Sequence, residues 1–314
     1  MSSKVLLSID GGGIRGIIPL CALIELERQT GRPARETISF VAGTSTGAII
    51  AAGLARGIPA EQMLDLYQNL GPRIFRKDVP GWIFSLGSFK YRSRPLYDLL
   101  GERLGACALN QLETDVLITA KRVSDGRPFY FVRDNEVNDQ ITGKLDLIDC
   151  VTASSAAPTY FEPWDVPGIG PCVDGGVGIA GNPVYQMCVE AFYYTPSGAY
   201  TPADCIVVSL GTGVYDARFS PNNLVAWANW VVGELLMSPA EQQTELVLRH
   251  FQTAGTYRLN PSLPRDIGLD GINAIPELIE IGRQAATQIN WADILAGRPT
   301  LTRVLSASAL RRAR

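Results

Sequence analysis

The chain has 314 residues, of which 46% are hydrophobic and 19% charged, and its formal net charge is −3 at neutral pH. A chain of this length and composition buries a substantial core, which excludes an intrinsically disordered protein, and it lacks the excess basic charge that nucleic-acid binding requires. No stretch reaches the ~18 uninterrupted apolar residues of a membrane span, and the first residues lack the features of a secretory signal. We therefore expect a cytoplasmic globular protein whose six scattered cysteines are reduced thiols.

The first sixty residues alternate between strand and helix patterns, which is typical of a parallel sheet. In chain order, the pattern predicts a strand over 4–9, a glycine-rich loop over 11–16, a helix over 17–30, a strand over 38–42 and, after a turn at 43–47, an apolar helix that ends at Gly57. Pro59 then begins an amphipathic helix.

Residues 72–94 interrupt this alternation, because they combine large apolar side chains with six basic residues against a single acid, Asp78. The apolar residues are Phe75, Trp82, Ile83, Phe84, Leu86 and Phe89, and the basic residues are Arg73, Arg76, Lys77, Lys90, Arg92 and Arg94. Aromatic rings and cations together suit the boundary of an anionic lipid layer. The segment is therefore expected either to form a mobile cap that touches the membrane, or to pack its rings on the core while its cations stay solvated.

The rest of the chain continues with mixed elements. They are a helix from Pro95, strands over 116–123 and 129–133, a helix over 147–157, a run of strand residues ending at Asp174, a helix over 183–192, a strand over 205–210, and a mainly helical part over 214–314. No repeat or convincing linker divides the chain, so we expect a single domain over 1–314.

The strongest local motif is Gly43-Thr44-Ser45-Thr46-Gly47, between a predicted strand and a predicted helix. A nucleophile at such a turn adopts a strained backbone conformation, and the two flanking glycines avoid steric clashes there. The turn would place the Ser45 hydroxyl at the N-terminal end of the helix, where a developing oxyanion is favoured. The motif predicts a serine nucleophile, whereas a glycine-rich turn with an incidental serine is the simpler alternative.

The loop Asp10-Gly11-Gly12-Gly13-Ile14-Arg15-Gly16 has two functional interpretations. Its spacing fits a dinucleotide-binding loop, but the next strand ends in Val41-Ala42-Gly43 and lacks the acid that would bind the ribose. Alternatively, its glycine amides form an oxyanion hole at a helix N-terminus. Consecutive strand-to-helix loops of a parallel sheet emerge at the same edge, so this loop and Ser45 are expected to be neighbours.

A serine nucleophile needs a base, and the chain offers two candidates. His250 is the only histidine in the chain, and it falls within a predicted helix, where an ordinary surface histidine is the more economical interpretation. Asp174 stands at the end of a strand and is followed by Gly175 and Gly176, which allow a close approach. A DGG sequence is also a common structural turn, but Asp174 is the preferred base.

Taken together, these motifs resemble those of the patatin-like phospholipase family. The glycine loop resembles the family's oxyanion loop, Gly43 to Gly47 resembles its nucleophile elbow, and Asp174-Gly175-Gly176 resembles its aspartate motif. Residues 153–161, Asn182-Pro183 and 208–213 also fit the family pattern, so the resemblance extends over about residues 4–213. It implies a three-layer α/β/α sandwich with a central, mostly parallel sheet.

The resemblance also implies a serine lipid acyl hydrolase of the phospholipase A or lysophospholipase type that acts on membrane glycerolipids. It implies a Ser45–Asp174 dyad without a metal or other cofactor. The amides of Gly12 and Gly13 would hold the oxyanion, while Gly11 and Arg15 shape the loop. A dinucleotide-binding module and a binding or storage protein with a silent dyad are the remaining alternatives.

Overall fold

The computed structural model describes residues 3–74, 89–133, 141–177, 181–196, 198–215, 227 and 240–298. Its strands are β1 (Lys4–Ile9), β2 (Phe40–Gly43), β3 (Asp115–Arg122), β4 (Pro128–Val132), β5 (Trp164–Val166), β6 (Gly170–Asp174), β7 (Cys205–Leu210) and β8 (Gly255–Leu259). They form one sheet in the order β5-β6-β3-β2-β1-β7-β8, and β4 also pairs with β3. The strands from β3 to β8 along this order run parallel, while β4, β5 and β6 pair antiparallel.

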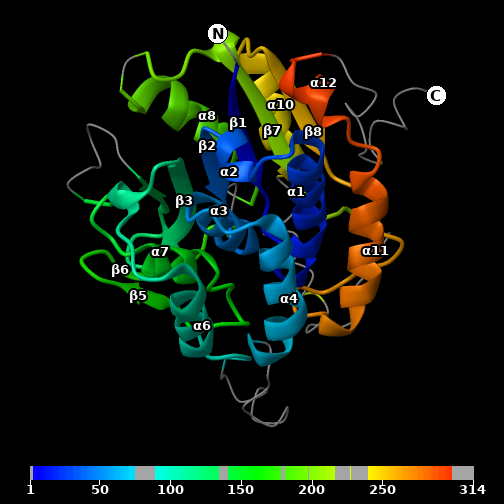
Figure 1. Cartoon of the computed structure of the whole chain (residues 1–314). Helices are drawn as coiled ribbons and strands as arrows, with labels where there is room; N and C mark the ends of the chain where they lie inside the picture. The colour runs from blue at the N-terminus through cyan, green and yellow to red at the C-terminus, as the bar shows by residue number, and fades with distance from the viewer. Residues whose placement is uncertain are drawn as a thin grey trace.

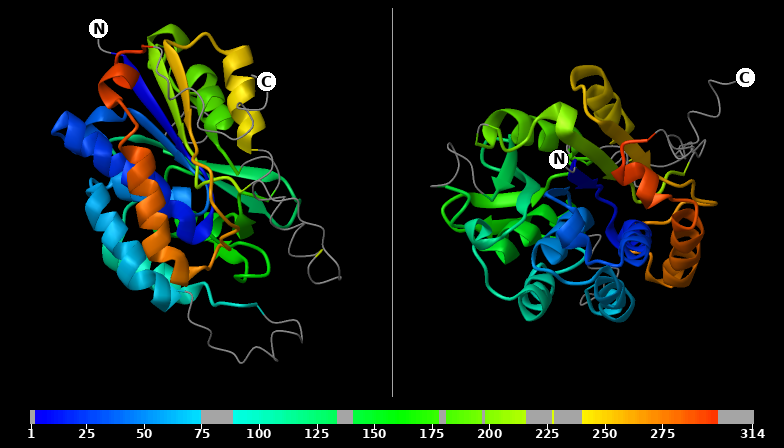
Figure 2. Two further views of the ribbon diagram at one scale, coloured as in Figure 1. Left: turned by 90° about the vertical axis from the view of Figure 1, so that its right-hand side faces the viewer. Right: turned by 45° about the horizontal axis from the view of Figure 1, so that its top comes forward.

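Helices cover both faces of the sheet (Figures 1 and 2). One face carries α1 (Ile17–Thr30), α3 (Thr46–Ala55), α4 (Ala60–Ile74), α6 (Arg94–Leu104), α7 (Leu147–Ser154), α11 (Ile275–Ala286) and α12 (Trp291–Leu295). The other face carries α8 (Val184–Val189), which continues into a π-helical turn η3 (Glu190–Tyr194), and α10 (Ala240–His250). Short helical segments lie at α2 (Ala34–Thr37), η1 (Gly13–Gly16), η2 (Leu109–Gln111), η4 (Pro202–Asp204) and η5 (Ile272–Ala274).

The alternation of side chains along the central strands explains the two layers. In β1, Val5, Leu7 and Ile9 belong to the core beneath α1 and α3, whereas Leu6 belongs to the core beneath α8 and α10. Because both faces are covered, the strand has no polar face and reads as a continuous apolar run, interrupted only by the buried Ser8. The predicted three-layer α/β/α class is confirmed.

Strand β3 determines how two loops meet. Its residues Asp115–Ile118 pair with β2, and Ala120–Arg122 pair with β6. Strand β4 overlaps both of these pairings along β3, so it must occupy the opposite edge, and β2 and β6 share one edge. They run toward each other along it, since β2 is parallel to β3 and β6 is antiparallel. The carboxyl ends of β2 and β6, at Gly43 and Asp174, therefore face each other.

Two strands were not anticipated from the sequence. Strand β5 is only three residues long, and β8 lies in the part of the chain that was expected to be mainly helical. Strand β8 is the edge strand beside β7, and its buried residues include charged Arg258, which interrupts the apolar pattern of the sequence. Among the residues that the structure describes, no helix is long and apolar enough to cross a bilayer.

Candidate active site

Ser45 lies in the turn between β2 and α3, in the strained backbone conformation that the elbow motif predicts. Its φ is 55° and its ψ is −122°. A Cβ on Gly43 would lie 2.2 Å from the Gly47 carbonyl oxygen, and a Cβ on Gly47 would lie 2.2 Å from that of Ile9. Both flanking positions therefore exclude any side chain, and the turn is pressed against the end of β1.

Asp174 stands at the end of β6 and is almost completely buried, at 1% exposure. Its carboxylate accepts a hydrogen bond from the Gly176 amide at 2.8 Å, and the Ser45 side chain also hydrogen-bonds it. Burial raises the pKa of Asp174 from 3.8 to about 6, although both hydrogen bonds lower it. The structure thus brings the predicted nucleophile and the predicted base together.

Thr119 in β3 holds both loops in place. Its hydroxyl and that of Thr44 are 2.7 Å apart, and a Cβ on Gly175 would lie 2.1 Å from Thr119 Oγ1. The absence of a side chain at Gly175 therefore lets the aspartate turn close onto the strand that also borders the elbow.

The glycine loop lies beside Ser45, as expected from the shared sheet edge. A Cβ on Gly11 would lie 3.3 Å from the Ser45 Cβ. Gly12 packs against Thr212, and Gly13, with φ of 57°, packs against the Leu269 carbonyl, so a side chain fits at neither position. Within the described ranges, the amides of Gly12 and Gly13 donate no backbone hydrogen bond, and η1 begins there. Amides at a helix start that no carbonyl of the described residues accepts from suit an anion.

Arg15 and Asp10 anchor the two ends of this loop in the protein interior. Arg15 is 4% exposed, and its Nε donates to the Gly12 carbonyl at 3.4 Å. Burial lowers the pKa of Arg15 to about 10, so it stays cationic at neutral pH. Asp10 accepts two hydrogen bonds from Arg258, at 2.9 and 2.6 Å, and Arg258 also donates to Glu241.

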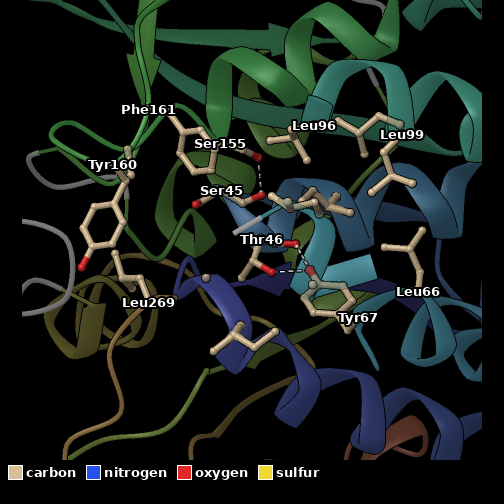
Figure 3. Close-up of a pocket in the computed structure, with 17 residues that line it drawn as sticks. Ser45, Thr46, Leu66, Tyr67, Leu96, Leu99, Ser155, Tyr160, Phe161 and Leu269 are labelled. Atoms are coloured by element: carbon tan, nitrogen blue, oxygen red, sulfur yellow. Dashed lines mark hydrogen bonds between the residues drawn. The ribbon is translucent and has the colours of Figure 1, made fainter. Parts of the chain in front are cut away.

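An apolar pocket opens directly above Ser45 (Figure 3). It is narrow, since the centre of a water-sized sphere can occupy only about 60 Å³ of it. Figure 3 places Leu66, Leu96 and Leu99 on one side of Ser45, and Tyr160 and Leu269 on the other. Among the residues that the structure describes, no charged side chain lines it. We name this space the acyl pocket.

Two further serines, Ser154 and Ser155, hold the elbow by hydrogen bonds to Ser45. The sequence motifs did not identify them individually. The Ser45 amide donates to Ser154 Oγ at 2.9 Å, and the Ser155 hydroxyl donates to the Ser45 carbonyl at 3.3 Å. Both lie at the end of α7, within the 153–161 segment that fits the family pattern. Their small size and polarity in an otherwise apolar helix are the signal that could have identified them.

His250 is distant from this arrangement in the fold. It ends α10, on the sheet face opposite α3, and its exposed ring hydrogen-bonds the Tyr185 hydroxyl at 3.0 Å. The geometry therefore offers no part for His250 beside Ser45.

Residues 75–88, which include Trp82 and Phe84, lie outside the described residues, and so does most of the predicted membrane cap. The described end of that segment is engaged with the protein. Lys90 pairs with Asp270, and Arg92 pairs with Glu162 at 3.0 Å.

Comparison with known proteins agrees with this geometry. The family described as "Patatin-like phospholipase" matches residues 7–187. The "cGAMP-activated phospholipase" of Vibrio cholerae is 30% identical over 90% of this chain and 90% of its own length. "Patatin-like protein 2" of Arabidopsis thaliana is 32% identical over 72% of this chain and 65% of its own. "Calcium-independent phospholipase A2-gamma" of Rattus norvegicus is 29% identical over 84% of this chain and 36% of its own. The chain belongs to the patatin-like phospholipase family and is a lipid-hydrolysing enzyme.

Proposed function

We propose that the protein releases fatty acids from membrane glycerolipids through an acyl-enzyme on Ser45, with Asp174 as the base and without a metal ion. The observation that carries the proposal is the hydrogen bond between buried Asp174 and Ser45, which lines an apolar pocket. A fatty acyl chain has the chemistry that this pocket can bury.

In the first half-reaction, Asp174 accepts the hydroxyl proton of Ser45 while its Oγ attacks the ester carbonyl. The amides of Gly12 and Gly13 stabilise the oxyanion of the tetrahedral intermediate. Asp174 then gives the proton to the departing alcohol, which leaves the acyl group on Ser45. In the second half-reaction, Asp174 takes a proton from water, the resulting hydroxide attacks the acyl-enzyme, and Ser45 regains its proton as the fatty acid leaves.

The raised pKa of Asp174 serves this chemistry. A carboxylate with an ordinary pKa near 3.9 is a poor acceptor for a serine proton, and an acceptor is most effective when its pKa lies closer to the working pH. Burial supplies this increase, while the Gly176 amide fixes the orientation of the carboxylate.

The proposal is tested by comparing wild type with Ser45→Ala, Asp174→Asn and His250→Ala on phospholipid vesicles and on a soluble p-nitrophenyl ester. We expect the first two variants to lose hydrolysis and His250→Ala to stay within a few-fold of wild type. A fall of about 10⁴ or more in His250→Ala, as for loss of a triad member, would restore the histidine as the base.

Two further arms of the assay address the metal and a possible activator. Hydrolysis should continue in EDTA. Each reaction is also run with and without cGAMP, which is named as the activator of the Vibrio cholerae relative. Near-wild-type turnover by Asp174→Asn under either condition would contradict the dyad.

A further inference from the structure

A second cavity lies behind the acyl pocket, on the side away from the glycine loop. The two cavities have four wall residues in common: Ile49, Leu66, Tyr67 and Leu100. We name the second one the rear chamber, and the centre of a water-sized sphere can occupy about 190 Å³ of it. Because the same side chains border both spaces, the two cavities are adjacent, and these four side chains lie between them.

The spacing of the wall residues shows the direction of this continuation. Along α3, Ser45 and Ile49 border the acyl pocket, and Ile49 and Gly53 border the rear chamber. Residues four apart lie on the same face of a helix, one turn of about 5.4 Å from each other. The rear chamber is therefore reached by moving along α3, away from Ser45.

The two helices that face α3 repeat this arrangement. On α6, Leu96 and Leu100 border the acyl pocket, and Leu100 and Leu104 border the rear chamber. On α4, Tyr67 borders both spaces, and Met63, one turn earlier in the helix, borders the rear chamber only. Three helices thus carry one apolar lining through both spaces, and Figure 3 shows Leu66, Leu96 and Leu99 at the side of Ser45 where the passage begins.

The inner wall of the rear chamber is apolar and adaptable. A Cβ on Gly53 would lie 2.2 Å from the Met63 sulfur, so the missing side chain leaves room for Met63. Glycine inside a helix is unfavourable, and methionine is the most flexible of the large apolar side chains. Protein interiors are normally close-packed, so an apolar space left between α3, α4 and α6 has room for an apolar ligand.

The outer end of the rear chamber has a different chemistry. Gln62, Glu102 and Arg103 border it and are exposed to solvent. The apolar part therefore lies between Ser45 and a polar opening, which suits the remote end of a flexible apolar chain.

We propose that the rear chamber receives the methyl-terminal part of a long acyl chain whose ester carbonyl lies at Ser45. The proposal rests on the function proposed above and extends it to a preference for long-chain acyl esters. The side chains of Ile49, Leu66, Tyr67 and Leu100 would line the passage between the proximal and distal parts of the chain.

The test compares a short and a long ester in the same variants. Ile58 borders the rear chamber only, and Ile58→Trp should fill it. We expect kcat/KM for p-nitrophenyl butyrate to stay within about two-fold of wild type. For p-nitrophenyl palmitate it should fall about ten-fold or more, the loss expected when a few methylene groups are no longer buried.

Ile24→Trp is the matched control, because Ile24 is also partly buried but borders neither of the two cavities. It should change both esters equally. If Ile58→Trp does not fold, Gln62→Trp at the exposed rim replaces it. Equal effects of the chamber variant on both esters, or no effect on either, would overturn the proposal.

A binding experiment separates failure of the rear chamber from failure of the proposed function. Palmitate is titrated calorimetrically into Ser45→Ala and into Ser45→Ala combined with Ile58→Trp. The proposed hydrolysis is wrong, but the rear chamber is supported, if wild type hydrolyses no ester while Ser45→Ala binds palmitate and Ile58→Trp weakens that binding. Equal palmitate binding by the two variants removes the chamber.

Discussion

At the scale of single residues, the backbone of Ser45 combines strain with function. A non-glycine residue at φ of 55° and ψ of −122° is held there by its surroundings, and such positions store roughly 1–3 kcal/mol. The hydrogen bonds from Ser45 to Ser154 and from Ser155 to Ser45 fix the turn on both sides. Stability is therefore given up at the residue that the proposed reaction needs most.

We predict that Ser45→Gly is more stable than Ser45→Ala by about 1 kcal/mol, because glycine adopts this conformation without strain, even after its larger unfolded-state entropy is included. Both variants lack the hydroxyl, so the comparison isolates the backbone. Urea denaturation of the two proteins measures the difference. Equal midpoints, or a higher one for Ser45→Ala, would show that the turn is not strained.

The second residue-scale prediction concerns pH and activity. The proposed base must be ionised, and its pKa is raised by burial to about 6. We therefore expect kcat/KM on a soluble ester to rise with pH through about 6 and then level off. A profile measured from pH 4 to 8 checks this, and a constant rate across that range would argue against Asp174 as the base.

The same pKa determines how stability depends on pH. The folded protein keeps the Asp174 proton up to about pH 6, whereas the unfolded chain releases it near 3.8, so ionisation of Asp174 favours unfolding as pH rises between these values. Asp174→Asn removes this penalty and keeps an acceptor for the Gly176 amide. We predict a gain of up to about 3 kcal/mol at pH 7 and none below pH 4, as measured by denaturation at both pH values.

At the scale of the elements, the glycine loop depends on strand β8 at the far edge of the sheet. Arg258 of β8 forms a two-point ion pair with Asp10, and both are buried. Burial alone would lower the pKa of Arg258, but the carboxylates of Asp10 and Glu241 raise it, so the pair is charged. The loop that carries the proposed oxyanion amides is thus tied to a residue almost 250 positions later.

We predict that Arg258→Met lowers the free energy of unfolding by about 3–5 kcal/mol, because it leaves the Asp10 charge buried without its partner. The double variant Asp10→Asn, Arg258→Met should recover part of this loss, since no charge remains uncompensated. Urea denaturation of wild type, both single variants and the double variant gives the unfolding free energies of a double-mutant cycle. Strictly additive losses would mean that the pair is not coupled.

The elements also show what the sequence could and could not predict. The elbow and the glycine loop were identified because glycine is required where a side chain has no space, as at Gly43 and Gly13, and that requirement is visible locally. Strand β8 and Arg258 were missed because their significance comes from a partner far away in sequence. The serines of α7 were underestimated for the same reason, since their hydrogen bonds reach across to the elbow. The acyl pocket could not be predicted, because it is formed jointly by α3, α4 and α6.

At the scale of the whole molecule, the expected contact with lipid involves residues 72–94. Residues 90–92, at the described end of this segment, are held by the protein. Lys90 and Arg92 are paired with acids, and Tyr91 is buried against Phe161. These residues anchor the segment beside Tyr160 and Phe161, at the acyl pocket. The proposed interfacial role therefore falls on residues closer to Trp82 and Phe84.

We predict that replacing Trp82 and Phe84 with serine weakens binding to anionic phospholipid vesicles and slows hydrolysis of bilayer lipid, because aromatic rings partition to the headgroup boundary. Turnover of a short soluble ester should be unchanged. Vesicle sedimentation and both hydrolysis assays measure these effects. A lower melting temperature together with loss of soluble-ester turnover would place the two rings in the core.

The position of β1 in the sheet has a consequence for biosynthesis. Although β1 is synthesised well before its neighbour β7, which ends at Leu210, the Arg258 partner of Asp10 follows almost fifty residues after that. Until then Asp10 lacks its ion-pair partner, and the glycine loop that follows it lacks this anchor. We expect nascent chains arrested before residue 255 to hydrolyse no ester, although they already contain Ser45 and Asp174. A lipid-hydrolysing enzyme would thus stay inactive during its own translation.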